Sequence, residues 1–528
     1  MRTTFLPISG VIIISLLMTA HLIFRSPDFP FSTDSAAYIE QARTLVQEGS
    51  ALIFPYGPDG IDKMPDKLFP IGFPIALAFI SIFGLDPREA ALIVGWLSAI
   101  LLPLLLYVSF RKQIGSSSAA ILAGLSVLSP GVLTYAPMGL SDVFALAIAV
   151  SAIGVVLNAR STTLFFVSGA VAGFAYAVRN ANIALLLALA VYFLYLWASN
   201  PPQRAETTKR FLAFLAGLSL VILPLFLRNI MIFGTLNPYI MEPSTIGVIQ
   251  NVRMYIVEFI YDLSALRYLG IYIGWSIPGL ILLLVSVIGA SRLLMFMWIH
   301  LTENRRNTIF LCITYSIIGA CVVIAARSRY EWGEPINIRH TLQYTSFFMA
   351  AILAAIPNTS SNVSLSRIRK GGLILVFALG FFHVFYSVKP KEYERRARHD
   401  FYAMNAYQNG KGYLCAPEEN ILFVSNWAYV FRILCSTGVR YIDIDNLKYS
   451  APKSSFSGTV QASNALVNIL LDLSNRFKEK PIRAGFYPNQ AGLEIRDILL
   501  DKVDVANLQS AGWIIVKSNN TGLLLTHQ

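Results

Sequence analysis

The chain has 528 residues, of which 55% are apolar and only 14% are charged, and its formal net charge is +12 at pH 7. A soluble protein of this length needs a larger charged surface, so the composition excludes that class. The basic residues form no stripe with interleaved aromatic residues, as nucleic-acid binding would require. They gather in short clusters at the ends of apolar segments, a pattern that sets the orientation of a membrane protein.

Seven apolar segments approach the roughly 20 residues that cross a bilayer as a helix. They are 5–24, 88–110, 139–157, 210–227, 269–290, 308–326 and 371–388. Such segments must be helical in lipid, because no water is present to satisfy the backbone. The first segment follows Arg2 like a signal peptide, but its core is long and no small-x-small cleavage site follows. We therefore expect a retained anchor.

The basic clusters between these segments predict which ends face the cytoplasm. They are Arg111 with Lys112, Arg160, Lys209 with Arg210, Arg305 with Arg306, and Arg367 with Arg369 and Lys370. A chain with about eleven spans places every cluster inside, with the N-terminus inside and the C-terminus outside. Segment 69–84 is apolar, but it is only about 16 residues long and begins with Pro70 and Pro74. If this segment crossed the membrane, the basic clusters that follow it would lie on the outer side. We therefore predict an outer interfacial helix that does not cross.

Three regions follow from these patterns. Residues 1–390 form a membrane domain with a first outer loop at 25–87, residues 391–410 form a polar linker, and residues 411–528 form a small α/β domain on the outer side. In that domain the sequence predicts strands at 420–425, 439–443, 513–516 and 522–526, and helices at 462–477 and 493–502. Cys415 and Cys435 would form a disulfide in an oxidising compartment, or they are two free buried thiols.

The first outer loop contains the most informative stretch, STDSAAYIEQARTLVQE at 32–48. From Asp34 onward it reads as a surface helix with one apolar face, formed by Tyr38, Ala42, Leu45 and Val46. Asp34 at its start has two interpretations. It is an ordinary helix N-cap, or it is a general base that accepts the proton of an acceptor hydroxyl.

A second acidic cluster follows in the same loop and consists of Asp59, Asp62, Lys63, Asp66 and Lys67, with Asp86 and Glu89 further along. Such residues usually form a solvated face. A divalent cation could use the carboxylates, because hard cations favour oxygen ligands. The spacing matches no known metal-binding loop.

Single charges at outer span ends form the third group: Asp142, Arg179, Arg228, Arg267, Arg339 and His340. Ionisable residues at membrane depth are costly and usually face a bundle interior or a water-filled cavity. The alternative is that each long side chain reaches the interface from the end of its helix. Arginines around one cavity would suit a phosphate or pyrophosphate, because guanidinium forks match phosphate oxygens.

Local motifs in chain order resemble one family. They are TDSAAYIEQA, KLFPIGFPIALAFISIFG, GLSDV, AYAVRN, LRNIMIFGTLNP, INIRHTLQY and ILFVSNWAYVFRILCSTGVRY. Together they resemble the polyprenol-phosphate-dependent glycosyltransferases of the GT-C superfamily, such as the protein O-mannosyltransferases and the lipid A aminoarabinose transferases. The chain departs from that pattern at Ser35, where many relatives carry Glu, and at His340, where they carry Tyr.

The resemblance implies a helical GT-C-like membrane fold. It also implies a hexosyl- or pentosyltransferase whose donor is a polyprenyl-phosphate-linked sugar that reaches the enzyme through the membrane lipid. The acceptor would be a hydroxyl of a glycan, a lipid or a protein. By the resemblance, Asp34 is the base of an inverting displacement, and Lys67, Arg179, Arg339 and His340 bind the donor phosphate. Asp142 and Tyr38 would position the acceptor or a basic residue. No cofactor is obligatory and no metal site is predicted, although a divalent cation is compatible with the family. The expected location is the bacterial cytoplasmic membrane, with the C-terminal domain extracytoplasmic.

Two other functions remain open. A glycan ligase would differ mainly in taking its sugar from a pyrophosphate carrier. A transporter or flippase for a lipid-linked saccharide would predict two similar halves and helices broken near the midplane. The sequence shows neither feature.

Overall fold

The computed structural model describes most of the chain. The described residues are 2–25, 30–53, 63–239, 243–264, 301–330, 335–356, 391–415, 421–425, 427–435, 441–443, parts of 467–475, 481–487, 502–519 and 522–527. The predicted spans at 269–290 and 371–388 lie outside them. The chain divides into two compact units. The membrane unit comprises Met1–Ser26, Lys67–Ala76 and Leu92–Lys391, and the sheet unit comprises Pro27–Asp66, Leu77–Ala91 and Glu392–Gln528.

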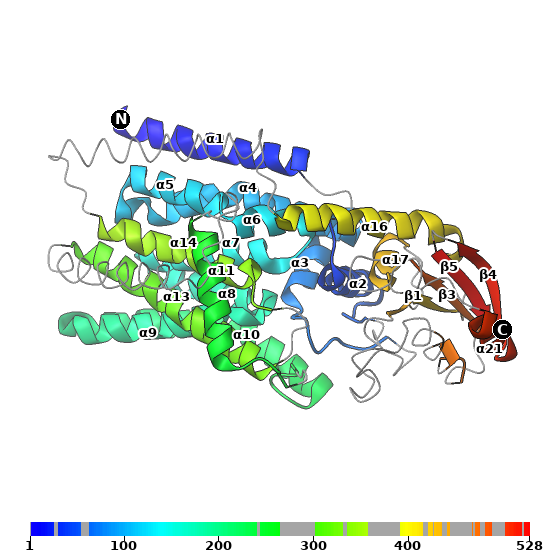
Figure 1. Ribbon diagram of the computed structural model, residues 1–528. Helices are drawn as coiled ribbons and strands as arrows, with labels where there is room; N and C mark the ends of the chain where they lie inside the picture. The colour runs from blue at the N-terminus through cyan, green and yellow to red at the C-terminus, as the bar shows by residue number, and fades with distance from the viewer. Residues whose placement is uncertain are drawn as a thin grey trace. The chain divides into compact units, whose positions relative to one another are not determined.

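The described part of the membrane unit is built from helices, several of them long and apolar (Figure 1). They are α1 (Arg2–Arg25), α4 (Pro87–Ile114, whose first residues belong to the sheet unit), α5 (Ser116–Val127), α6 (Pro130–Tyr135), α7 (Ser141–Asn158), α8 (Thr162–Val178), α9 (Ile183–Ser199), α10 (Arg204–Phe233), α11 (Val248–Ser264), α13 (Glu303–Arg329) and α14 (Ile338–Ala355). Among the described helices, six are long and apolar enough to cross a membrane, or seven if the bent pair α5–α6 is one span. The protein is therefore an integral membrane protein.

The predicted spans at 5–24, 88–110, 210–227 and 308–326 fall within α1, α4, α10 and α13, and the span predicted at 139–157 corresponds to α7, which begins two residues later. The segment predicted not to cross forms α3 (Gly72–Ser81), a helix of 10 residues. A helix of that length extends only about 15 Å, half the thickness of the hydrocarbon core.

Helices α8 and α10 pack closely because glycine faces glycine across their interface. A Cβ atom at Gly169 would clash with the backbone oxygen of Phe214, and a Cβ atom at Gly217 would clash with that of Phe166. Small residues allow such close approach where lipid leaves little hydrophobic drive between helices. This packing fixes α8, whose last residues lead to Arg179.

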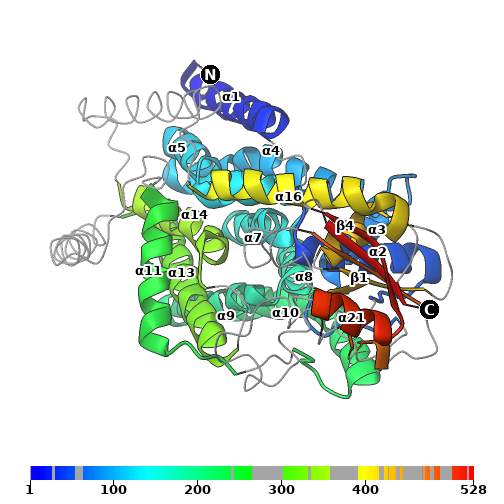
Figure 2. The same ribbon diagram turned by 45° about the vertical axis from the view of Figure 1, so that its right-hand side comes forward.

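Helix α14 packs in the interior of the membrane unit, beside α13 and α11 in both views (Figures 1 and 2). The Phe347 ring lies 6.3 Å from Phe110 of α4 and 4.8 Å from Tyr315 of α13. Further along, α11 contributes Asp262, which is 1% exposed and accepts hydrogen bonds from Gly131 N at 2.8 Å and Thr345 Oγ1 at 2.6 Å. A buried carboxylate thus ties α11, α6 and α14 together.

The sheet unit contains α2 (Thr33–Glu48), α16 (Lys391–Leu414), α17 (Ala428–Leu434), α21 (Lys502–Ser510) and a five-stranded sheet. The strands are β1 (Leu422–Ser425), β2 (Tyr441–Asp443), β3 (Ile482–Phe486), β4 (Trp513–Asn519) and β5 (Gly522–His527), in the order β2-β1-β3-β5-β4. Strand β1 is parallel to both β2 and β3, and β5 is antiparallel to β3 and β4. One face packs on helical residues Leu470, Leu473 and Leu508.

The predicted α/β character of the C-terminal region is confirmed, and four strands fall where the sequence predicts them. Strand β3 was not predicted. The predicted helix at 493–502 lies outside the described residues except for its last residue, where α21 begins. The predicted linker at 391–410 is helical and forms most of α16. Cys415 and Cys435 are joined by a disulfide, which resolves the alternative left open above.

Candidate active site

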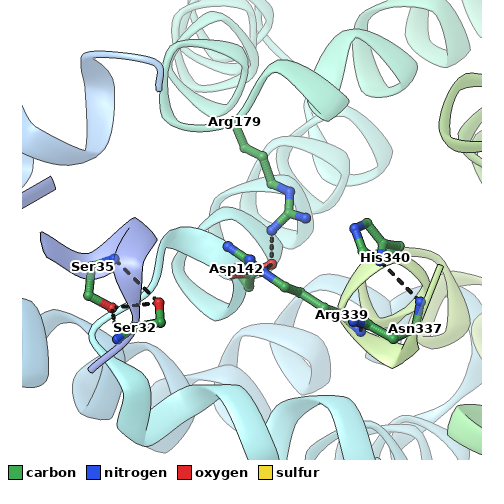
Figure 3. Close-up of polar contacts among 7 residues, drawn as sticks. All are labelled: Ser32, Ser35, Asp142, Arg179, Asn337, Arg339 and His340. Carbon is green, nitrogen blue, oxygen red and sulfur yellow. Dashed lines mark hydrogen bonds and ion pairs between the residues drawn. The ribbon is translucent and has the colours of Figure 1, made fainter. Parts of the chain in front are cut away.

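Three predicted residues of the membrane unit form one ionic cluster, shown in Figure 3. The Asp142 carboxylate accepts hydrogen bonds from Arg339 Nε at 3.1 and 3.0 Å. Arg179 forms an ion pair with Asp142 through Nη1 and Oδ1. Asp142 is fully buried, whereas the side chains of Arg179 and Arg339 are 17% and 15% exposed. The structure therefore brings together residues that are far apart in the sequence.

Helix ends place these three side chains. Asp142 lies in the first turn of α7, and Arg339 lies in the first turn of α14, after the N-cap residue Asn337. Arg179 is the C-cap of α8, where its N–H still donates to Ala175 O at 3.0 Å. Polar side chains at helix ends keep their backbone partners while the apolar helix bodies pack. The cluster is thus a consequence of where three helices begin or end.

His340 completes the capping box of α14. The Asn337 N–H donates to His340 Nδ1 at 3.2 Å, and the Asn337 side chain accepts from Arg339 N at 2.9 Å. Since a backbone N–H only donates, Nδ1 carries no proton, and the neutral ring has its proton on Nε2. The imidazole also lies within electrostatic reach of Arg179, Arg339 and Arg327. A neutral ring with one donor suits this cationic surrounding.

The charges described in this cluster are mainly positive. Two guanidinium groups converge on the one carboxylate of Asp142, and Arg327 adds a third cation near His340. A partly exposed pair of guanidinium forks held by a buried carboxylate is suited to phosphate oxygens. The arrangement can neutralise an anionic group that enters the cluster.

Two further buried polar residues lie in the membrane unit and were not predicted from the sequence. Arg327 in the last turn of α13 is 2% exposed and donates to Ser244 Oγ at 3.2 Å and to Tyr330 O at 3.0 Å. Gln343 follows Arg339 by one turn of α14, is 2% exposed, and has both amide atoms buried without a hydrogen-bond partner. The sequence placed Arg327 in an outer loop rather than in the last turn of α13. A single amide side chain in an apolar helix forms no periodic pattern, so Gln343 did not stand out.

In the first outer loop, the N-cap of α2 is not the residue that one interpretation of the sequence predicted. Ser32, not Asp34, is the N-cap of α2: its side chain accepts from Ser35 N at 3.4 Å, and Ser35 Oγ accepts from Ser32 N at 3.1 Å (Figure 3). Asp34 lies in the first turn. The cap interpretation of Asp34 is therefore wrong. Tyr38 and Ala42 are buried as an apolar face requires, whereas Val46 is 47% exposed.

The remaining predicted residues have other surroundings. Lys67 belongs to the membrane unit, is exposed, and forms no ion pair with a described carboxylate. Asp66 is 7% exposed and accepts from Gln41 Nε2 at 3.2 Å. Asp59, Asp62 and Arg267 lie outside the described residues. Within the described ranges, no group of three or more His, Cys, Asp or Glu side chains could hold a metal ion.

Comparisons with known proteins identify the fold. Neither a protein-family model nor a curated protein matches the sequence. ArnT from Cupriavidus metallidurans bound to undecaprenyl phosphate matches with a TM-score of 0.61 at 13% identity, over 98% of this chain and 97% of that one. The archaeal oligosaccharyltransferase AglB from Archaeoglobus fulgidus, in complex with an inhibitory peptide and a dolichol-phosphate, matches with a TM-score of 0.51 at 12% identity, over 91% and 69%. Both are GT-C proteins, so the predicted GT-C-like fold is confirmed.

Proposed function

We propose that this chain is a membrane glycosyltransferase that moves a sugar from a polyprenyl-phosphate donor to an acceptor hydroxyl on the extracytoplasmic side. The observation that supports it most is the convergence of Arg179 and Arg339 on buried Asp142. The cluster occurs in a fold shared with ArnT, which was solved with undecaprenyl phosphate. The bacterial cytoplasmic membrane is the proposed location.

The guanidinium groups would act on the leaving group. When the bond between the anomeric carbon and the phosphate oxygen breaks, the polyprenyl phosphate takes the electron pair and gains negative charge. Arg179 and Arg339 would stabilise that charge, and preorganised stabilisation of this kind is often the largest catalytic contribution. Asp142 would hold the two forks in place. His340 Nε2, Arg327 and Lys67 are further donors for phosphate oxygens.

The acceptor hydroxyl would be activated by Asp34. Its carboxylate accepts the hydroxyl proton while the oxygen forms a new bond to the anomeric carbon, opposite the departing phosphate. One displacement of this kind inverts the anomeric configuration. A positioned base contributes about 10²–10⁴ in rate. Tyr38, on the same helix, is the proposed partner that orients the acceptor.

A glycan ligase is the second candidate, and the fold similarity to AglB favours it to a lesser extent, since the TM-score is lower and the coverage of that chain is 69%. Its donor would carry a pyrophosphate. A divalent cation would then matter more, because two phosphate groups need more counter-charge. Donor preference therefore separates the two activities.

The test is transfer in proteoliposomes. Full-length protein is reconstituted with radiolabelled polyprenyl-phosphate or polyprenyl-pyrophosphate sugars and a crude acceptor fraction, and Asp34→Asn is compared with the wild type. We expect label to reach the acceptor from the monophosphate donor, and Asp34→Asn to be slower by about 10²-fold or more. Equal rates would exclude Asp34 as the base. Transfer from the pyrophosphate donor alone identifies a ligase, and movement of lipid-linked sugar across the bilayer without transfer identifies a transporter.

A further inference from the structure

The helix that carries Asp34 is tied to the C-terminal part of the chain inside the sheet unit. Arg432 of α17 donates from Nη1 to Glu40 Oε2 of α2 at 3.2 Å, across 392 residues of sequence. The two side chains are 3% and 15% exposed. Solvent screens such a pair much less than a surface pair, so it holds its geometry better. Glu40 and Arg432 therefore join α2 to α17 directly.

Arg43, on the same helix, binds the C-terminal end of α17. Its Nη1 donates to Arg432 O at 3.0 Å, and its Nη2 donates to Ile433 O at 3.1 Å. Carbonyls in the last turn of a helix carry partial negative charge and favour a cation. Nη2 also pairs with Asp86 at 3.2 Å, and Asp86 accepts from Arg88 N at 2.8 Å at the start of α4. Arg43 thus connects α2 with two other segments.

A disulfide fixes the same end of α17. Cys435 follows the last helical residue, donates its N–H to Phe431 O at 2.8 Å, and is bonded to Cys415 just after α16. The ring of Phe431 packs on Tyr407 of α16 with centroids 6.3 Å apart. A helix of 7 residues is too short to be stable alone, so its position depends on such tethers.

We propose that α17 is a positioning element for the helix that carries the base. Glu40, Arg43 and Arg432 hold α2, and the Cys415–Cys435 disulfide holds α17. A base must lie within hydrogen-bond reach of the acceptor proton, and a displacement of about 1 Å costs about 10²-fold in rate. These are positioning residues and need not touch substrate. The catalytic consequence rests on the proposed function, whereas the effect on α2 does not.

Hydrogen exchange on the full chain tests the structural step without any substrate. In Glu40→Gln and Arg432→Met, amides of Thr33–Glu48 should exchange about 10-fold faster or more, while those of α14 stay protected. Arg432→Lys should restore part of the protection. The matched control is Glu48→Gln on the same helix, because Glu48 pairs only with the partly exposed Lys63 among the described residues. Unchanged exchange in α2 would overturn the proposal.

The double variant adds a second criterion. If Glu40 and Arg432 act as a pair, Glu40→Gln combined with Arg432→Met should exchange no faster than the more affected single variant. Additive effects of the two substitutions would show that each side chain acts separately, and the pair would not be the tether. Replacing Cys415 and Cys435 together by serine should accelerate exchange in α2 as well. If α2 keeps its wild-type protection, the disulfide has no part in holding it.

Kinetics test the catalytic step. We expect Glu40→Gln and Arg432→Met to lower kcat by about 10- to 100-fold while the KM for the donor changes less than twofold. Glu48→Gln should leave both constants unchanged. A higher donor KM with unchanged kcat would overturn the positioning role. If the wild type transfers no sugar, the proposed function fails, and the exchange experiment still decides whether α17 holds α2.

Discussion

Arg339 donates from a single nitrogen, Nε, to both carboxylate oxygens of Asp142, at 3.1 and 3.0 Å, across 197 residues of sequence. Because Asp142 is fully buried and also pairs with Arg179, the carboxylate is held on two sides. The planar guanidinium therefore has a defined orientation at the start of α14. An orientation set by a buried partner is the kind of preorganisation that recognition of phosphate requires.

Under the proposed function, Arg339→Gln should lower transfer from the polyprenyl-phosphate donor by about 10²–10³ in kcat, because the substitution removes a charge proposed to stabilise the leaving phosphate. Arg339→Lys should be intermediate, since an ammonium keeps the charge but loses the fork. Steady-state kinetics in proteoliposomes measure both. Arg329→Gln is the matched control, because this exposed side chain stacks on Tyr330 at the end of α13. Equal activity of Arg339→Gln and wild type would contradict the role.

Ser32 and Asp34 allow capping to be separated from catalysis. Ser32→Ala should destabilise the start of α2, by about 1 kcal/mol, because the capping hydrogen bond to Ser35 N is lost. Asp34→Asn should leave the exchange protection of α2 unchanged while kcat falls, since Asp34 is not the cap. Hydrogen exchange and kcat are measured on the same preparations. Loss of α2 protection in Asp34→Asn would show that its main role is structural.

Much of the membrane architecture could be predicted from the sequence, because lipid requires long apolar helices. The prediction that 69–84 does not cross depended on length and parity, and the helix found there, α3, is shorter still, with 10 residues. By contrast, the polar composition of 391–410 suggested a linker, although Ala403 and Ala406 of α16 are buried. Strand β3 was missed because Arg483 and Gly485 interrupt an already short apolar pattern.

The three charged residues of the ionic cluster could be singled out from the sequence one by one, but their common geometry could not be predicted. Asp142, Arg179 and Arg339 are each charged residues next to apolar segments. Because burying a charge at membrane depth is costly, such residues are rare and can be recognised in the sequence. Their convergence depends on how α7, α8 and α14 pack, which no local pattern encodes. The contact of Arg43 with two backbone carbonyls of α17 was equally inaccessible, since a carbonyl carries no sequence signal.

Orientation across the membrane remains a prediction and is tested by labelling. In a Cys321→Ser background, Lys63→Cys should react with a membrane-impermeant maleimide added from the extracytoplasmic side. Lys209→Cys, at the basic start of α10, should react only after permeabilisation, because clustered Lys and Arg favour the cytoplasm. Labelling of position 63 from the cytoplasmic side would contradict the proposed orientation.

Arg305 should stabilise the membrane unit without serving the reaction. Its guanidinium donates to Ala354 O and Ile114 O, each at 3.2 Å, and to Ile356 O, so it binds the C-terminal ends of α14 and α4. Arg305→Leu should cost about 2 kcal/mol or more, seen as a lower Tm in detergent, with an unchanged donor KM. Arg306→Leu, which loses one hydrogen bond to Leu301 O, should cost less. A large rise in donor KM for Arg305→Leu would contradict a purely structural role.

Substitution of Gln343 tests whether its buried amide binds a ligand or only packs in the interior. Both its amide atoms are buried without a partner, a state that costs stability unless a ligand or water satisfies them. Gln343→Leu keeps the approximate volume, so Tm should rise, while the donor KM should increase about 10-fold if the amide binds the donor beside Arg339. Ser126→Ala on α5 is the matched control, because it removes a different buried polar group, a hydroxyl, that also has no partner. It should leave KM unchanged. A higher Tm with an unchanged KM in Gln343→Leu would show that the amide binds no part of the donor.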